Sequence, residues 1–125
     1  MLGKTNATAN IAVKDLAVAR KFYEETLGLT QVDAEGDEVI VMKSGDTLIN
    51  VYRSQFAGTN RATTVTWAVG DKIESIVKAL NGKGVAFEHY DMPDTRLEGD
   101  IHVGYGMKVA WFKDPDGNIL NLIDQ

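Results

Sequence analysis

The feature that most constrains this chain is an internal repeat, in which a strand pattern followed by a helix pattern occurs twice. Thr8 to Val13 alternates polar or small residues with apolar ones, and Thr64 to Val69 does the same, as is typical of strands buried on one side. Asp15 and Asp71 follow these strands as predicted N-caps, at the same offset of 56 residues that separates Thr8 from Thr64. A unit this small cannot bury its own apolar face, so we expect the two copies to pair about a pseudo-twofold axis.

Each copy continues with a helix and three strands. In the first copy the helical spacing of apolar residues ends at Gly28, and in the second copy it ends at Asn81-Gly82. A polar segment from Ser54 to Arg61 is predicted as a linker, and the polar, glycine-rich stretch from His89 to Gly106 as a long, flexible loop. The predicted strands are Thr30 to Ala34, Glu38 to Lys43 and Thr47 to Arg53 in the first copy, and Val85 to Glu88, Met107 to Lys113 and Asn118 to Ile123 in the second.

The last strands of the chain are joined by the turn Asp114-Pro115-Asp116-Gly117-Asn118 between two apolar runs. Proline fixes φ where a turn begins, and glycine permits positive φ, so this stretch predicts a tight hairpin. The expected fold class is therefore α+β, with two βαβββ modules in a single domain over residues 1–125. We place the modules at about residues 5–54 and 61–125.

Composition limits the possible partners. The chain has no cysteine, which excludes disulfides, thiolate chemistry and Cys-based zinc sites. Its net charge is −5 and its Lys and Arg residues are scattered, so we expect no binding to nucleic acid or to anionic membranes. The opening residues lack the apolar run of a signal peptide, and no apolar run is long enough to span a membrane, which predicts a cytoplasmic protein.

Strand alternation separates the side chains of each copy into two faces. The strongly apolar residues form the face that the helix covers, and small polar residues share the opposite face. If the two sheets curve toward each other, that face lines a shared cleft. Thr8 and Asn10, with Asn50 and Tyr52, occupy it in the first copy, and Thr64, Thr66 and Asn121 occupy it in the second.

Two longer motifs stand out in the sequence. They are Val13-Lys14-Asp15-Leu16 leading into Ala19-Arg20-Lys21-Phe22-Tyr23-Glu24-Glu25-Thr26-Leu27-Gly28-Leu29, and the terminal Trp111-Phe112-Lys113-Asp114-Pro115-Asp116-Gly117-Asn118. With these motifs the chain resembles the vicinal oxygen chelate superfamily, which includes glyoxalase I, extradiol dioxygenases, fosfomycin-resistance thiol transferases, methylmalonyl-CoA epimerase and bleomycin-resistance proteins. The resemblance implies paired βαβββ modules that form a cupped, partly open barrel-like sheet with the helices outside. It also implies a homodimer, in some members domain-swapped.

The resemblance also implies where a divalent metal would be held. Carried over position by position, the family's His, Glu or Gln ligands correspond here to Thr8, Asn50, Thr64 and Asn121. Neutral hydroxyl and amide oxygens are too weak to hold iron, manganese, nickel or zinc alone. We therefore predict that the metal site is lost and that the protein needs no cofactor, with a divalent metal as the alternative.

The candidate ligand-binding residues combine this polar set with aromatic side chains that could stack on a flat ligand, although aromatic residues in strands more often belong to the core. His89 and His102 are the only histidines, and both fall in the predicted loop. They are either solvent-exposed or, if the loop is a lid, include a catalytic His102. The ligand-binding candidates are Thr8, Asn10, Asn50, Tyr52, Thr64, Thr66, Tyr105, Trp111 and Asn121.

Two functions remain open from the sequence. One is a metal-free binding protein that resembles bleomycin-resistance proteins and holds an aromatic or amphipathic small molecule. The acidic balance would suit a cationic ligand. The other is a glyoxalase-like lyase, isomerase or dioxygenase that uses loop residues or an atypical divalent metal. The Thr and Asn replacements favour the first, so the sequence leans away from an enzyme.

Overall fold

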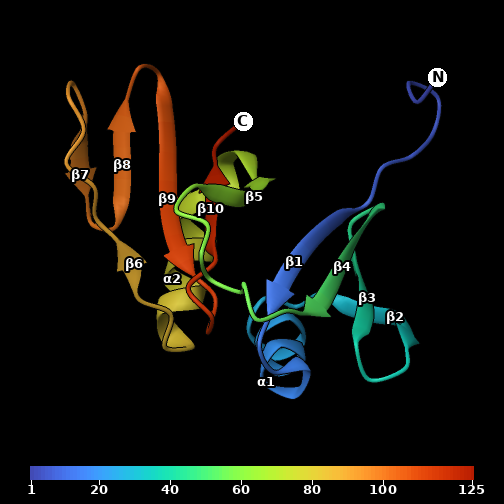
Figure 1. The fold of residues 1–125 in the computed structure, drawn as a ribbon. Coiled ribbons are helices and arrows are strands. Elements are labelled where there is room, and N and C mark those ends of the chain that lie inside the picture. Colours follow the sequence, from blue (N-terminus) through green and yellow to red (C-terminus); the bar gives the residue numbers. More distant parts are fainter. The chain divides into compact units, whose positions relative to one another are not determined.

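The computed structural model describes residues 1–125, and the chain forms two compact units, Met1–Thr59 and Asn60–Gln125. Each unit contains a mixed sheet and a helical segment (Figure 1). The helical segment of each unit contributes buried apolar side chains to the core. The observed elements are α-helices and β-strands in both units, which confirms the α+β prediction.

Unit 1 contains a four-stranded sheet with the order β1-β4-β3-β2. β1 pairs with β4 in parallel, and the other pairs are antiparallel. The strands are β1 (Ala9–Val13), β2 (Thr30–Glu35), β3 (Val39–Ser44) and β4 (Thr47–Arg53). The predicted strand at Thr47 to Arg53 is confirmed at both ends.

The helix of unit 1 begins as predicted at Asp15, whose carboxylate accepts hydrogen bonds from the N–H groups of Ala17 at 2.9 Å and Val18 at 3.1 Å. α1 (Leu16–Lys21) then passes into a π-helical segment, η1 (Phe22–Thr26), which the sequence did not indicate. Gly28, at φ +82°, follows the helical segment, in agreement with the predicted stop.

Unit 2 contains a larger sheet with the order β5-β10-β9-β8-β7, in which β6 also pairs with β9. β5 and β10 are parallel, as β1 and β4 are in unit 1. The elements are β5 (Thr63–Ala68), the 3₁₀ turn η2 (Gly70–Lys72), α2 (Ile73–Gly82), β6 (Phe87–Glu88), β7 (Arg96–Glu98), β8 (Ile101–Gly104), β9 (Met107–Lys113) and β10 (Ile119–Ile123).

Two predictions for unit 2 were wrong. The stretch from His89 to Gly106 is not one long loop, because β7 and β8 form an antiparallel pair within it and only residues 89–95 remain irregular before that pair. These strands are three and four residues long, too short for alternation to be visible among polar neighbours. Asp71 is not the N-cap of α2: it lies within η2, and the cap position is Lys72 without a side-chain hydrogen bond.

The core of each unit lies on the face of the sheet that carries its apolar alternate positions. Tyr23 is fully buried beside this face in unit 1, and Ile73 from α2 is fully buried in unit 2. We call the opposite face the helix-free face. The buried apolar strand residues are Ile11, Val13, Ile40, Met42, Ile49 and Val51 in unit 1, and Phe87, Ile101, Ala110, Phe112, Leu120 and Leu122 in unit 2.

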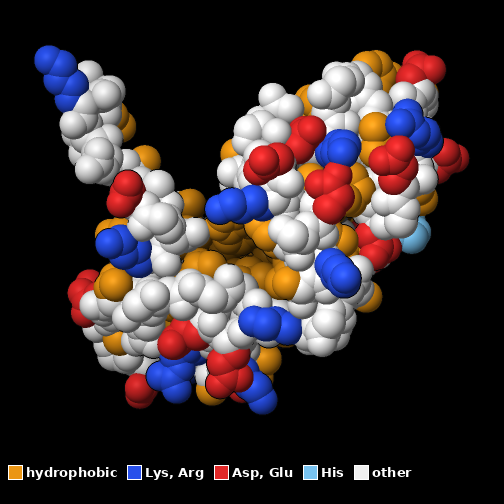
Figure 2. Space-filling model, turned by 180° about the vertical axis from the view of Figure 1, so that it is seen from behind, with side chains coloured by type: hydrophobic (Ala, Val, Ile, Leu, Met, Phe, Trp, Pro, Cys, Tyr) orange, Lys and Arg blue, Asp and Glu red, His pale blue; other side chains and the backbone are white.

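Charged side chains of both signs are interspersed over the surface drawn in Figure 2, without a large patch of one sign. No helix of the structure is both long enough and apolar enough to cross a membrane.

The turn between β9 and β10 is organised by one buried carboxylate. Asp114 is 5% exposed and accepts hydrogen bonds from the backbone N–H groups of Asp116 at 3.0 Å and Asn118 at 2.9 Å, and from the Asn118 amide at 2.8 Å. The Asp114 N–H also donates to the Asn118 carbonyl at 3.0 Å. Asp114 thus holds the hairpin in one conformation.

We expect Asp114→Ala to lower the free energy of unfolding by roughly 3 kcal/mol, because it leaves buried donors without an acceptor. Asp46→Ala, an exposed position in the β3–β4 turn, is the matched control and should change stability by less than about 0.5 kcal/mol. Urea unfolding followed by circular dichroism measures both. Equal effects of the two substitutions would contradict the role of Asp114.

Candidate functional site

Three of the predicted ligand-binding residues come together on the helix-free face of unit 1. Asn10 of β1 is the register partner of Asn50 on β4, and Tyr52 lies two residues further along β4. These side chains line a hollow of about 270 Å³, which we call the unit-1 hollow. Its lining residues are Asn10, Glu35, Val39, Val41, Asn50 and Tyr52.

Thr8 does not join this group. It lies before β1, is exposed, and does not line the unit-1 hollow. The alternation pattern included Thr8 because it continues the strand backward by one residue, but β1 begins at Ala9.

A second set of predicted residues forms a row across three strands of unit 2, and Glu88 continues the row on a fourth strand. Asn121 of β10 is the register partner of Thr66 on β5 and of Trp111 on β9, and Trp111 pairs in turn with Glu88 on β6. Asn121 is 8% exposed, and its Oδ1 atom is buried without a hydrogen-bond partner. This acceptor is a polar group that the fold buries and leaves unsatisfied.

Thr64 is not part of this row. A register shift between Ile119 and Leu120 takes Thr64 out of the ladder, so that Thr63 rather than Thr64 lies opposite Ile119. The Trp111 indole N–H donates to the Thr63 hydroxyl at 3.1 Å. Simple alternation placed Thr64 with Thr66, and it failed because one extra residue in a strand exchanges the faces beyond it.

His102 lies on β8 in an aromatic cluster and is buried, contrary to the expectation of a solvent-exposed loop residue. Its ring centroid is 5.0 Å from that of Trp111 and 6.1 Å from that of Tyr90, and the Tyr90 and Trp111 centroids are 5.3 Å apart. Nε2 accepts the Tyr90 backbone N–H at 2.9 Å, which places the proton on Nδ1, 3.3 Å from the Val109 carbonyl oxygen. Both ring nitrogens therefore contact backbone groups, and neither is left to exchange a proton with a substrate. The catalytic role of His102 remains a prediction.

His89 forms a different polar contact. Its Nε2 lies 2.7 Å from Oδ1 of Asp100, whose Oδ2 accepts the side-chain amide of Asn81 at 2.9 Å. The hydrogen bonds from Asn81 and from His89, in that order of importance, hold the pKa of the Asp100 carboxyl below its ordinary value. This contact connects α2, the segment after β6 and the β7–β8 turn.

Tyr105, the remaining candidate, lies in the β8–β9 turn and lines a pocket of unit 2 together with His102. None of the three row residues, Thr66, Trp111 and Asn121, lines that pocket. Sequence reasoning placed Tyr105 in the ligand site with the row, whereas the structure places it in a pocket of its own.

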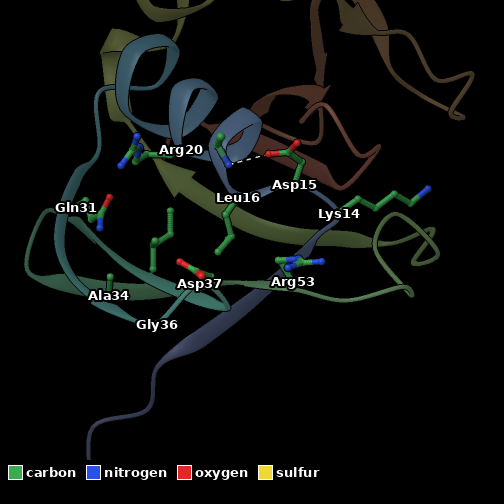
Figure 3. A pocket seen from close by; sticks show the side chains of 11 residues that line it. Lys14, Asp15, Leu16, Arg20, Gln31, Ala34, Gly36, Asp37 and Arg53 are labelled. Atoms are coloured by element: carbon green, nitrogen blue, oxygen red, sulfur yellow. Dashed lines mark hydrogen bonds between the residues drawn. The ribbon is translucent and has the colours of Figure 1, made fainter.

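A larger cavity of about 460 Å³ lies between α1 and the β2–β3 turn of unit 1 (Figure 3). Leu16 and Ile40 contribute apolar surface, and Arg20, Asp37 and Arg53 contribute charges. Both arginines are within ion-pair distance of glutamates, Arg20 at 3.8 Å from Glu24 and Arg53 at 3.3 Å from Glu38. Sequence reasoning missed this cavity because it depends on the tertiary approach of a helix to a turn. Because the lining carries charges of both signs, it indicates no single ligand class.

The residues at the family's metal positions do not fit a transition metal. Asn50 and Asn121 offer amide oxygens, Thr8 lies outside its strand, and Thr64 lies outside its ladder. No group of three or more His, Cys, Asp or Glu side chains is placed to hold a metal ion.

The fold and these sites define a protein of two βαβββ-type units with polar rows on their helix-free faces. The chain belongs to the Glyoxalase/Bleomycin resistance protein/Dioxygenase superfamily, whose family model matches residues 5–122. A search of curated proteins found no match.

Solved structures show the same fold at low sequence identity. A glyoxalase family protein from Enterococcus faecalis is 22% identical, with a TM-score of 0.74 over 98% of this chain and 99% of the other. Lactoylglutathione lyase from Agrobacterium tumefaciens is 16% identical, with a TM-score of 0.70 over 96% and 92%. The fosfomycin resistance protein FosX from Mesorhizobium loti is 13% identical, with a TM-score of 0.70 over 98% and 92%.

The Asp100 contact makes a testable prediction about pH. Because the folded-state pKa of Asp100 lies below its unfolded value of about 3.9, ionised Asp100 stabilises the fold above that value, and the contribution is lost as pH falls through the folded-state pKa. Asn81→Ala should raise the pKa of Asp100 toward the ordinary value. Carboxyl ¹³C NMR measures the shift, and an Asp100 midpoint that Asn81→Ala leaves unchanged would contradict it.

Proposed function

We propose that this protein binds a small organic molecule on the helix-free face of unit 1, without a metal ion. The observation that carries the proposal is the convergence of Asn10, Asn50 and Tyr52 on the unit-1 hollow. A concave site with apolar walls and a few converging polar groups is the usual arrangement for recognition of small molecules.

The lining of the hollow supports an amphipathic ligand. The two side-chain amides can each donate and accept hydrogen bonds, so together they suit a neutral polar group. Val39 and Val41, with the ring of Tyr52, offer apolar and aromatic contact. Glu35 adds a negative charge at the hollow, and the net charge of −5 acts in the same direction, so a cationic group is preferred over an anionic one.

Unit 2 offers contacts of the same chemical type. The Asn121 Oδ1 atom lacks a hydrogen-bond donor, and a buried acceptor in this state costs about 1–3 kcal/mol. A donor from a ligand or a water molecule would remove that cost. The unpaired acceptor supports the view that neutral amide and hydroxyl groups make the ligand contacts in both units.

The competing proposal is an enzyme, since two of the similar structures are a lactoylglutathione lyase and a fosfomycin resistance protein. A glyoxalase-like lyase, isomerase or dioxygenase would need loop residues or an atypical divalent metal. The engaged ring nitrogens of His102 favour binding over catalysis by that residue. A pH-dependent turnover that His102→Ala abolishes would favour the enzyme. The homodimer and the cytoplasmic location also remain predictions.

Metal content tests the metal-free part of the proposal. We expect less than roughly 0.1 equivalent of any transition metal in untagged protein purified without chelator, because amide and hydroxyl oxygens hold such metals weakly. Elemental analysis by mass spectrometry measures this. Close to one equivalent would overturn the metal-free proposal.

Binding itself is tested by thermal shift with a panel of aromatic and amphipathic cations, and the anionic compounds fosfomycin and lactoylglutathione serve as comparisons. For a compound that raises Tm, Asn50→Leu and Tyr52→Leu should each weaken binding about tenfold, since each removes one hydrogen-bonding or stacking contact. Asn6→Leu, at an exposed asparagine outside the strands, is the control and should not change the affinity. If all three variants bind alike, the ligand does not occupy the unit-1 hollow.

A further inference from the structure

Unit 2 contains a pocket of about 310 Å³ between the β8–β9 hairpin and the segment that precedes β7. We call it the loop pocket. It shares no residue with the unit-1 hollow, and its walls are largely apolar. The lining residues are Met92, Pro93, Thr95, His102, Gly104, Tyr105, Met107 and Val109.

The turn that forms one wall has an unusual residue. Tyr105 and Gly106 have φ of +53° and +70°, as the two central positions of a type I′ hairpin turn require. Asn or Gly normally occupies the first of these positions, and a residue such as tyrosine costs about 1–2 kcal/mol in this conformation. The turn therefore carries a residue that its own backbone does not favour.

Tyr105 makes contacts that a standard turn residue could not make. Its hydroxyl lies 3.3 Å from the Pro93 carbonyl oxygen and 3.3 Å from Oδ2 of Asp94, in the segment that precedes β7. Asp94 also has positive φ, +59°. Aspartate adopts positive φ more readily than tyrosine does, so the backbone strain lies at Tyr105. Strain of this kind is often found where a residue serves a function.

A second contact, next to Tyr105, holds the hairpin against the same segment. A Cβ atom added at Gly104 would lie 2.6 Å from the Asp94 carbonyl oxygen and 2.8 Å from Cγ2 of Thr95. Only glycine permits this approach of the segment to β8. The loop pocket is consequently preformed by packing and does not depend on a ligand for its shape.

The polar side chains of the pocket already have partners within the protein. Thr95 donates to the Met92 carbonyl oxygen at 2.8 Å, both nitrogens of His102 contact backbone groups, and the Tyr105 hydroxyl has the contacts described above. What remains for a guest is the thioethers of Met92 and Met107, with apolar and aromatic surface. Such walls favour a flat, uncharged ring, because a charged group would lose hydration without compensation.

We propose that the loop pocket is a second binding site, separate from the unit-1 hollow, that takes an uncharged aromatic ring and uses Tyr105 as one wall. The site goes beyond the proposed function, because it lies in the other unit and requires neither Asn50 nor Tyr52.

The four methionines of the chain allow a direct test. With ¹³C-methyl methionine labelling, 1-naphthol should shift the methyl resonances of Met92 and Met107 and leave those of Met1 and the core residue Met42 in place. 1-Naphthalenesulfonate, which adds a charge to the same ring system, should bind at least about tenfold more weakly. Unshifted Met92 and Met107 resonances, or equal affinity for the two probes, would overturn the proposal.

Tyr105→Asn tests the wall itself. Asparagine suits the turn better than tyrosine, so Tm should be unchanged or higher while the affinity for 1-naphthol falls at least about fivefold. Phe56→Asn, at an exposed aromatic residue of unit 1 outside every pocket described, is the matched control and should bind like the wild type. Wild-type affinity in Tyr105→Asn would refute the role of Tyr105. Because the readout comes from Met92 and Met107, a failure of binding in the unit-1 hollow does not affect this result.

Discussion

Parallel pairing of the first and last strands of each unit is the constraint on which the rest of the structure depends. β1 pairs with β4, and β5 pairs with β10, in both cases through a connection that contains the helix. Parallel neighbours need such a crossover, and the crossover covers one face of the sheet. The other face is left for side chains brought together from the two ends of the unit. Asn10 beside Asn50 and Thr66 beside Asn121 are direct consequences of this pairing.

The chemistry of these faces is that of neutral groups in fixed positions. Amides and hydroxyls recognise a ligand by the direction of its hydrogen-bond donors and acceptors. Their electrostatic attraction to the ligand is weaker than that of a metal ion. His102 shows the same tendency in unit 2, since its ring acts as a neutral donor and acceptor between Tyr90 and Val109. A site of this kind selects a ligand mainly by shape and hydrogen-bond pattern.

Features that depend on local chemistry were predictable from the sequence. The Asp15 cap, the stop at Gly28 and the assignment of Ile49 and Val51 to the core each follow from a residue type and its immediate spacing. The same logic placed Asn10, Asn50 and Tyr52 on one face, where the structure gathers them in a hollow.

Features that depend on pairing between distant segments were not predictable. The shift that replaces Thr64 by Thr63 arises in the ladder between β5 and β10, and the strands β7 and β8 are too short to show a period. Asp71 carries the right side chain for a cap, but a 3₁₀ turn inserted before α2 moves the cap position to Lys72. The loop pocket required the approach of Gly104 to Asp94, which no local pattern encodes.

The buried turn at Asp114 has a consequence for how the chain can vary. β10 begins directly after this turn and pairs on both sides, with β9 and with β5. Its alternate residues Leu120 and Leu122 belong to the core, while Asn121 belongs to the helix-free face. The length of the turn therefore determines which residues of β10 point to the core and which to the helix-free face. An insertion or deletion of one residue in the turn would exchange the two sets. Substitution of Asn121 alone would alter the helix-free face and leave the packing of Leu120 and Leu122 in place. With the turn length fixed, the leucines of β10 can maintain the core while the residue at position 121 changes. The same strand can therefore take on a different binding chemistry without a change in its packing.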